Sequence, residues 1–217
     1  MTLSYSALKQ FDNCPRQYHE VRVLQKHPRQ ETEQTIWGKK VHLACEEYIR
    51  DGRDFNLDFP GQEGVTALRN LDGAKHCEME LAVNDKLEPV DFNDPTALIR
   101  GIADLVIVGK NYLRVIDFKT GSAKYPDTAQ LELMALLLFP LFPEAEESLG
   151  ALIFLAHNRI VSHQTKRSNA NDLWVNWFKK IQRIETAHET GVWNPKASGL
   201  CPWCPVVSCE HWKEKRR

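Results

Sequence analysis

The sequence predicts an α/β domain built around a mixed β-sheet. Helical periodicity near the N-terminus is followed by three strand-like segments, a helix, a strand pair and a last amphipathic helix. With 217 residues, 42% of them hydrophobic and 26% charged, the chain can bury a core without a metal or disulfide. Its net charge of -1 excludes a uniformly basic nucleic-acid binder, so any such surface must be local.

The N-terminal part reads as helices. Ser4 is a good N-cap, the Cys14-Pro15 pair interrupts that first helix, and Pro15 suits the first position of a second one. Apolar residues recur at helical spacing from Thr35 to Arg50, and Gly52 ends the segment. Residues 51–64, rich in Gly, Pro and Asp, are expected to form a loop.

The strands follow in the middle of the chain. Their expected ranges are Lys75 to Val83, Leu98 to Val108 and Tyr112 to Thr120, then Leu149 to His157 and Arg159 to Thr165. The turn residues 109–111 predict a hairpin between the second and third strands. Helices are expected over residues 127–139 and 171–188.

The segment "RVIDFKTG" carries the most informative chemistry. Asp117 and Lys119 are two residues apart on a strand and therefore share a face. If the hairpin pairs residues whose numbers sum to 221, Asp104 of "GIADLVIV" lies opposite Asp117. A shift of one residue would send Asp104 to the other face.

Two close carboxylates repel each other, and a divalent cation such as Mg²⁺ or Mn²⁺ relieves that repulsion. Lys119 at their side can orient a water or stabilise negative charge developing at phosphorus. The competing interpretation is that Asp117 and Lys119 form a plain surface pair. His42 in "GKKVH" and Gln130 in "AQLEL" add a possible ligand and a polar contact, although structural or solvated roles remain open for both.

The stretch "CPWCPVVSC" holds Cys201, Cys204 and Cys209, whereas thiolate metal sites usually have four ligands. The N-terminus lacks a secretory signal, and the apolar run 131–142 is too short to span a bilayer. We therefore expect a cytoplasmic protein without a membrane segment, whose six cysteines favour metal binding or core packing over disulfides.

Taken in order, "GKKVH", "GIADLV", "IDFKTG" and "QLEL" resemble the motifs of the RecB-type branch of the PD-(D/E)XK nucleases. The chain is most similar to the iron–sulfur members: the AddB nuclease domain and the stand-alone exonucleases of CRISPR adaptation. The resemblance implies a restriction-endonuclease-like mixed sheet flanked by helices, within one nuclease domain over residues 1–217. Segments 1–30 and 190–212 would form a clasp joined by a four-cysteine cluster.

The resemblance also implies site roles. The metal ligands would be His42, Asp104, Asp117 and the main-chain carbonyl of Phe118. Lys119 would assist the attacking water, Gln130 would help to position the substrate, and Glu80 is either an outer acid or a solvated strand residue. Met134 stands where the family commonly has a tyrosine.

In those relatives the fourth thiolate comes from an N-terminal Cys-Pro context, which here is Cys14. The implied cofactor is a structural [4Fe–4S] cluster on Cys14, Cys201, Cys204 and Cys209. The spacing from Cys204 to Cys209 is one residue shorter than usual in those members, and His211 lies nearby, so zinc remains an alternative.

The function so implied is a Mg²⁺- or Mn²⁺-dependent DNA exonuclease that prefers single-stranded ends. A separate helicase, or a partner in recombination, DNA repair or CRISPR adaptation, would supply unwinding or context. The alternatives are a non-catalytic DNA-binding or assembly subunit and a zinc-stapled interaction protein.

Overall fold

The computed structural model describes residues 1–28 and 31–213, and the chain divides into two compact units. The first, here called the sheet unit, comprises Met1–Thr2 and Glu31–Asn171. The second, the helical unit, comprises Leu3–Gln30 and Asp172–Arg217. The structure describes the predicted clasp segments 1–30 and 190–212 except for residues 29 and 30. That these segments are joined by a metal cluster within one nuclease domain over residues 1–217 stays a prediction.

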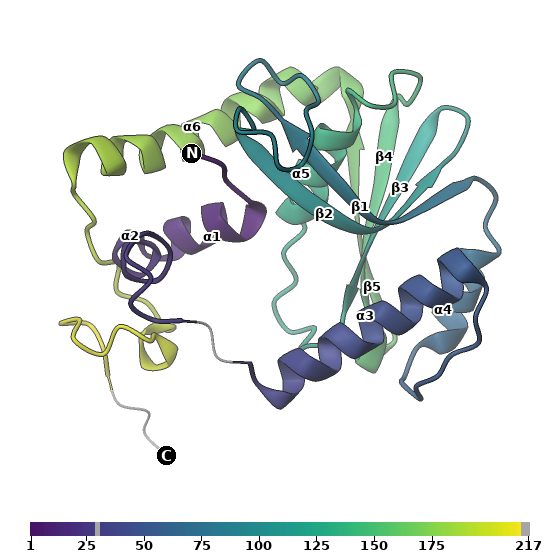
Figure 1. Cartoon of the computed structure of the whole chain (residues 1–217), viewed down its shortest axis with the longest axis horizontal. Coiled ribbons are helices and arrows are strands. Elements are labelled where there is room, and N and C mark those ends of the chain that lie inside the picture. Colours follow the sequence, from purple (N-terminus) through teal and green to yellow (C-terminus); the bar gives the residue numbers. More distant parts are fainter. Residues whose placement is uncertain (29–30, 214–217) are drawn as a thin grey trace. The chain divides into compact units, whose positions relative to one another are not determined.

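The sheet unit contains a five-stranded mixed sheet in the order β1-β2-β3-β4-β5 (Figure 1). Only β3 and β4 run parallel, because α5 connects them as a crossover; the other neighbouring strands are antiparallel. The mixed sheet is as the sequence predicts, except that Leu155–His157, expected at the end of the fourth strand, forms a 3-10 turn. Its strands are β1 (Ala74–Val83), β2 (Ile99–Val108), β3 (Tyr112–Lys119), β4 (Glu147–Phe154) and β5 (Arg159–Lys166).

Helices cover both faces of this sheet. α3 (Glu33–Asp51) and α4 (Gln62–Arg69) pack one face, where Val41 and Val65 meet Leu105 and Ile116 in a continuous apolar cluster. α5 (Ala129–Leu138) lies against the other face and contacts all five strands (Figure 1). The close approach of α5 requires Gly150, since a Cβ there would lie 2.8 Å from Leu131 Cβ.

The register of the β2–β3 hairpin is the one that the acidic pair requires. Leu105 pairs with Ile116 and Val108 with Leu113, so the paired numbers sum to 221 as predicted. The short turn after Val108 explains this, because a tight turn leaves little freedom to slip. The ladder ends at Leu105, and Asp104 comes directly beyond it.

The helical unit contains α1 (Tyr5–Asn13), α2 (Pro15–Tyr18), the π-helical turn η1 (His19–Val23), the short η4 (Cys201–Trp203) and all but the first two residues of α6 (Ala170–Thr190). The Ala7 amide donates to Ser4 Oγ at 3.3 Å, which confirms the predicted cap. Trp193 packs against two histidines of this unit: His19 stacks on its ring at 4.5 Å and His188 meets it edge-on at 4.8 Å.

A helix also forms where the sequence predicts a loop. Residues 51–64 were predicted as a loop, but α4 begins at Gln62, directly after Gly61 at φ 88°. The helix has eight residues and only Val65 is fully buried, so its apolar periodicity is too short to stand out against Pro60 and Gly61.

Candidate active site

Asp104 lies where β2 and β3 stop pairing. Its Oδ2 accepts a 2.7 Å hydrogen bond from the Phe118 amide, so the carboxylate takes the place of a main-chain acceptor. His42 comes from α3, and its Nδ1 lies 3.4 Å from the same oxygen. The carboxylate is thus held between a strand amide and an imidazole, with its side chain 14% exposed.

Asp117, Lys119 and Gln130 form a second, connected group. Gln130 Nε2 donates to Asp117 Oδ1 at 2.6 Å, and Lys119 Nζ donates to Gln130 Oε1 at 3.1 Å. Lys119 Nζ also lies 2.5 Å from Asp117 Oδ2 as an ion pair, although that buried oxygen has no hydrogen bond of regular geometry. The predicted shared face of Asp117 and Lys119 is confirmed by this contact.

Glu78 is the acid that sequence reasoning missed. One ligand atom from each of His42, Glu78 and Asp104 lies within 4.8 Å of the other two. Glu78 stands between the paired residues Cys77 and Met79 of β1, opposite Asp104, in a left-handed backbone conformation at φ 47°. Such a conformation costs free energy in a non-glycine residue and is found most often at functional sites.

Glu80, the acid that the sequence singled out, lies elsewhere. It is exposed and pairs with Ile102, so the structure favours its solvated interpretation. On a regular strand Glu78 and Glu80 would share a face, so in the sequence only the register of β1 on β2 tells them apart. The 15-residue connection between the two strands leaves that register open in the sequence.

The electrostatics of the two groups are those of crowded carboxylates. Burial, followed by the charge of Asp104, raises the pKa of Asp117, and Lys119 only partly opposes this. Burial and then Asp104 raise the pKa of Glu78 to about 7. Burial lowers the pKa of His42, but the hydrogen bond and charge of Asp104, with the charges of Asp117 and Glu78, outweigh it and raise that pKa.

Comparison with known proteins identifies the fold. The family model of the PD-(D/E)XK nuclease superfamily matches residues 2–209, nearly the whole chain. The chain belongs to the PD-(D/E)XK nuclease superfamily. A crystal structure described as a "putative exonuclease" from Eubacterium rectale matches with a TM-score of 0.56 and 11% identity, covering 100% of this chain and 90% of that one.

A second solved structure, described as SSO0001, has a TM-score of 0.49 and 17% identity, covering 98% of this chain and 87% of that one. No curated protein matches the chain. In the described part of this PD-(D/E)XK protein, no helix combines the length and apolar character needed to cross a membrane.

The residues of this PD-(D/E)XK site suit a hard divalent cation. Carboxylate oxygens from Glu78 and Asp104 and a nitrogen of His42 already converge, a donor set that accepts Mg²⁺ or Mn²⁺. Asp117 belongs instead to the lysine group in this structure, and the carbonyl of Phe118 lies in the β3–β4 ladder opposite Ile153. The ligand roles of these two residues stay predictions.

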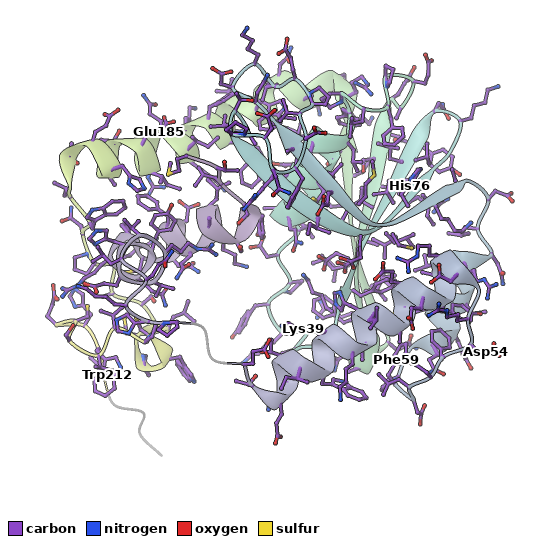
Figure 2. All side chains as sticks on the ribbon, in the orientation of Figure 1. Lys39, Asp54, Phe59, His76, Glu185 and Trp212 are labelled. Atoms are coloured by element: carbon purple, nitrogen blue, oxygen red, sulfur yellow. The ribbon has the colours of Figure 1, made fainter. Side chains whose placement is uncertain are left out.

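The four cysteines singled out in the sequence meet in the helical unit. Cys14, Cys201, Cys204 and Cys209 line one cavity together with His211, and none forms a disulfide. Burial raises the pKa of the Cys204 thiol. A backbone hydrogen bond from Val206 lowers this pKa in part, and the three neighbouring cysteines raise it slightly. Trp212, labelled in Figure 2, lines the same cavity.

Main-chain amides are directed at two of these sulfurs. The Lys196 amide donates to Cys14 Sγ at 3.4 Å, and the Ser198 amide donates to Cys201 Sγ at 3.3 Å. Amide donors to thiolates are a regular feature of iron–sulfur sites, where they tune the reduction potential. The remaining cysteines lie away from this cavity: Cys45 is fully buried in the sheet unit and Cys77 is half-buried on β1.

Proposed function

We propose that the protein is a divalent-metal-dependent DNA exonuclease that acts on strand ends and prefers single strands. The observation that carries this proposal is the adjacency of two groups in one unit: the ligand cluster His42, Glu78 and Asp104, and the Asp117–Lys119–Gln130 group linked to it by charge. A structural residue pair on an ordinary strand would not need a third acid held at positive φ.

His42, Glu78 and Asp104 would hold the cation, with Asp117 as a further ligand. A bound Mg²⁺ or Mn²⁺ supplies an activated water and neutralises charge that develops on the phosphate. Removing the repulsion among the carboxylates is a driving force for binding: burial and the charge of Asp104 raise the pKa values of Glu78 and Asp117, so ionisation of these two groups is unfavourable without a cation.

Lys119 is the residue that we expect to act on the phosphate itself. Asp117 and Gln130 fix the ammonium from two sides, so its charge is oriented before a substrate arrives. A preorganised cation stabilises a phosphorane-like transition state without the cost of reorganising solvent. The amide of Gln130 bridges Asp117 and Lys119 and keeps both side chains in place, next to the expected position of the substrate.

We propose that the cysteines of the helical unit hold a structural [4Fe–4S] cluster, with zinc as the alternative. The sulfurs of Cys14, Cys201, Cys204 and Cys209 share one cavity, and amides donate to two of them. The position of His211 at the same cavity is what keeps a three-cysteine, one-histidine zinc site as the alternative. The metal would link residue 14 to the C-terminal segment and so close a long loop within one nuclease domain over 1–217.

The proposed setting is the cytoplasm, with a helicase or a recombination, repair or CRISPR-adaptation complex as partner. The resemblance of the four motifs to RecB-type nucleases supports this setting, and the description of the Eubacterium rectale neighbour as an exonuclease supports the proposed activity. The chain's near-neutral charge agrees with a DNA contact limited to a small basic surface.

The test is digestion of 5′- and 3′-labelled single- and double-stranded DNA in Mn²⁺, Mg²⁺ or EDTA, with protein purified without oxygen. Lys119→Ala is the active-site variant, and Lys110→Ala, an exposed lysine in the β2–β3 turn, is the matched control. We expect end-dependent digestion by the wild type and the control, and none by Lys119→Ala. Intact, metal-loaded wild type without cleavage would favour a non-catalytic DNA-binding subunit instead.

A further inference from the structure

The loop between β3 and α5 presents a tyrosine to solvent. Tyr125 is 81% exposed, the highest value among the large apolar side chains that the structure describes. Tyrosine is usually at least half covered in folded proteins, and a ring this open gains nothing for the fold. An aromatic ring that is exposed to water without stabilising the fold suggests a contact with another molecule.

The backbone on either side of this ring is fixed. Ala123 is buried at 8% exposure, and Arg159 Nη1 donates to its carbonyl at 2.6 Å. Pro126 follows the tyrosine and restricts it to extended conformations, and Asp127 Oδ1 accepts from the Ala129 amide at 3.2 Å. Tyr125 is therefore held outward by an anchored loop, so ordering it against a ligand costs little entropy.

The position of the loop relates the ring to the chemistry. It begins after Lys119 and ends at α5, which carries Gln130 five residues after the tyrosine. Chain length alone limits the Cα separation of Tyr125 and Gln130 to about 18 Å. A strand bound at Lys119 and Gln130 can therefore pass the ring within a few nucleotides.

A cation accompanies the ring. Lys124 Nζ lies 5.1 Å from the centroid of the Tyr125 ring, and the Lys124 amide donates to Ser122 Oγ at 3.2 Å. An open aromatic ring beside a positive charge offers a base a stacking surface and its phosphate a counter-charge. This combination suits a nucleic-acid strand better than an apolar protein surface, which would leave the ammonium unpaired.

We propose that Tyr125 is a substrate-binding residue that stacks on a nucleobase of the bound strand, with Lys124 contacting the adjacent phosphate. The inference rests on the proposed nuclease function and deepens it by naming how an unpaired base is held next to the reacting phosphate. Stacking needs a base whose face is free, so the contact selects single strands or frayed ends over intact duplex, and it is indifferent to sequence.

The test is binding of a dye-labelled single-stranded oligonucleotide to the full chain in EDTA, where no cleavage occurs, measured by fluorescence anisotropy. A second oligonucleotide carries abasic sites at every position and so keeps the phosphates without the bases. The variants are Tyr125→Ala, Tyr125→Phe and Tyr125→Trp, and the control is Ile160→Ala, a residue of β5 that is 65% exposed.

We expect Tyr125→Ala to weaken binding of the base-bearing strand about tenfold, in the range found for loss of one stacked base. Phe and Trp should preserve the affinity, because they keep the ring, and Ile160→Ala should leave it unchanged. Binding of the abasic strand should not respond to Tyr125→Ala. An unchanged affinity for the base-bearing strand, or an equal loss for both strands, would overturn the proposal.

Together with the digestion assay in Mn²⁺ or Mg²⁺, this binding experiment separates the stacking inference from the nuclease function. If the wild type cleaves DNA but its affinity does not depend on the Tyr125 ring, the nuclease function stands and the stacking role is refuted. If the wild type binds through Tyr125 but cleaves nothing with Mn²⁺ or Mg²⁺, the stacking role stands and the proposed catalysis is refuted.

Discussion

The most informative perturbation is Glu78→Gln, because it separates the stability of the protein from its capacity to bind a cation. Glu78 adds a third ionisable group to His42 and Asp104, and burial with the charge of Asp104 raises its pKa to about 7. Glutamine has nearly the same shape and no charge. The variant should therefore be more stable than the wild type when no divalent cation is present.

The size of this effect follows from the pKa. A shift from 4.5 to about 7 corresponds to roughly 3 kcal/mol at 1.36 kcal/mol per unit. Solvent screens part of the interaction because the side chain is only half-buried, so we expect Glu78→Gln to raise the free energy of unfolding by about 1–2 kcal/mol at pH 8.

The sign with pH is equally defined. A carboxyl whose folded pKa is raised favours the folded state below its unfolded pKa near 4.5, and that contribution is lost as pH rises through about 7. Glutamine does not titrate. The advantage of Glu78→Gln should therefore be near zero at pH 4.5, grow between pH 5 and 7, and be complete at pH 8.

Urea denaturation in EDTA at pH 4.5 and pH 8 measures this directly. Glu80→Gln is the matched control, since it removes an exposed acid from the same strand and should not change the stability. Added Mn²⁺ should stabilise the wild type more than Glu78→Gln. A variant that is no more stable than the wild type at pH 8, or a gain independent of pH, would refute the assigned environment of Glu78.

Three further outcomes are expected. Asp104→Asn should weaken Mn²⁺ binding by at least about tenfold, because the substitution removes the charge of the side chain and alters its hydrogen bond with the Phe118 amide. The spin-resonance signal of the free ion measures the affinity, and an unchanged affinity would place the ion elsewhere. Gly150→Ala should cost about 1–3 kcal/mol of unfolding free energy because the new methyl meets Leu131. Gly64→Ala, on α4 with open space around it, should gain about 0.5–1 kcal/mol, and equal effects of the two glycine variants in urea melts would contradict the packing. Cys14→Ser should abolish bound iron by elemental analysis, while Cys77→Ser keeps it; metal retained without Cys14 would exclude Cys14 as a ligand.

The hairpin carrying Asp104 and Asp117 was predictable because its determinants are local. The three residues after Val108 form a tight turn, and a tight turn sets the register of both strands. The alternation of Ile116 and Phe118 with Asp117 and Lys119 then places each side chain on its face, and the packing of Ile116 and Phe118 against α3 agrees.

Glu78 was not predictable by the same reasoning, because its place depends on a pairing across a long connection. Residues 84–98 leave the register of β1 undetermined, so Glu78 and Glu80 look alike in the sequence. The positive φ of Glu78 is also invisible in the sequence, since it departs from the conformation that glutamate prefers. Strain of this kind appears only once the fold has imposed it.

The division into two units likewise depends on contacts distant in sequence. Cys14 and the three C-terminal cysteines belong to one unit although 195 positions separate Cys14 from Cys209. Spacing identified three of these cysteines as a ligand group, whereas the fourth came only from resemblance to a family. Their common cavity is a property of the folded helical unit.

The central claim is that Lys119 acts on a phosphate beside a cation held by the acidic cluster. It is tested most directly by the single-turnover rate of nucleotide release from an end-labelled single strand in Mn²⁺, for the wild type and Lys119→Ala. We expect a measurable wild-type rate that disappears in EDTA and falls by about 100-fold or more in Lys119→Ala, as for the loss of one preorganised transition-state contact. Equal rates for the two proteins, or release that persists in EDTA, would contradict the account.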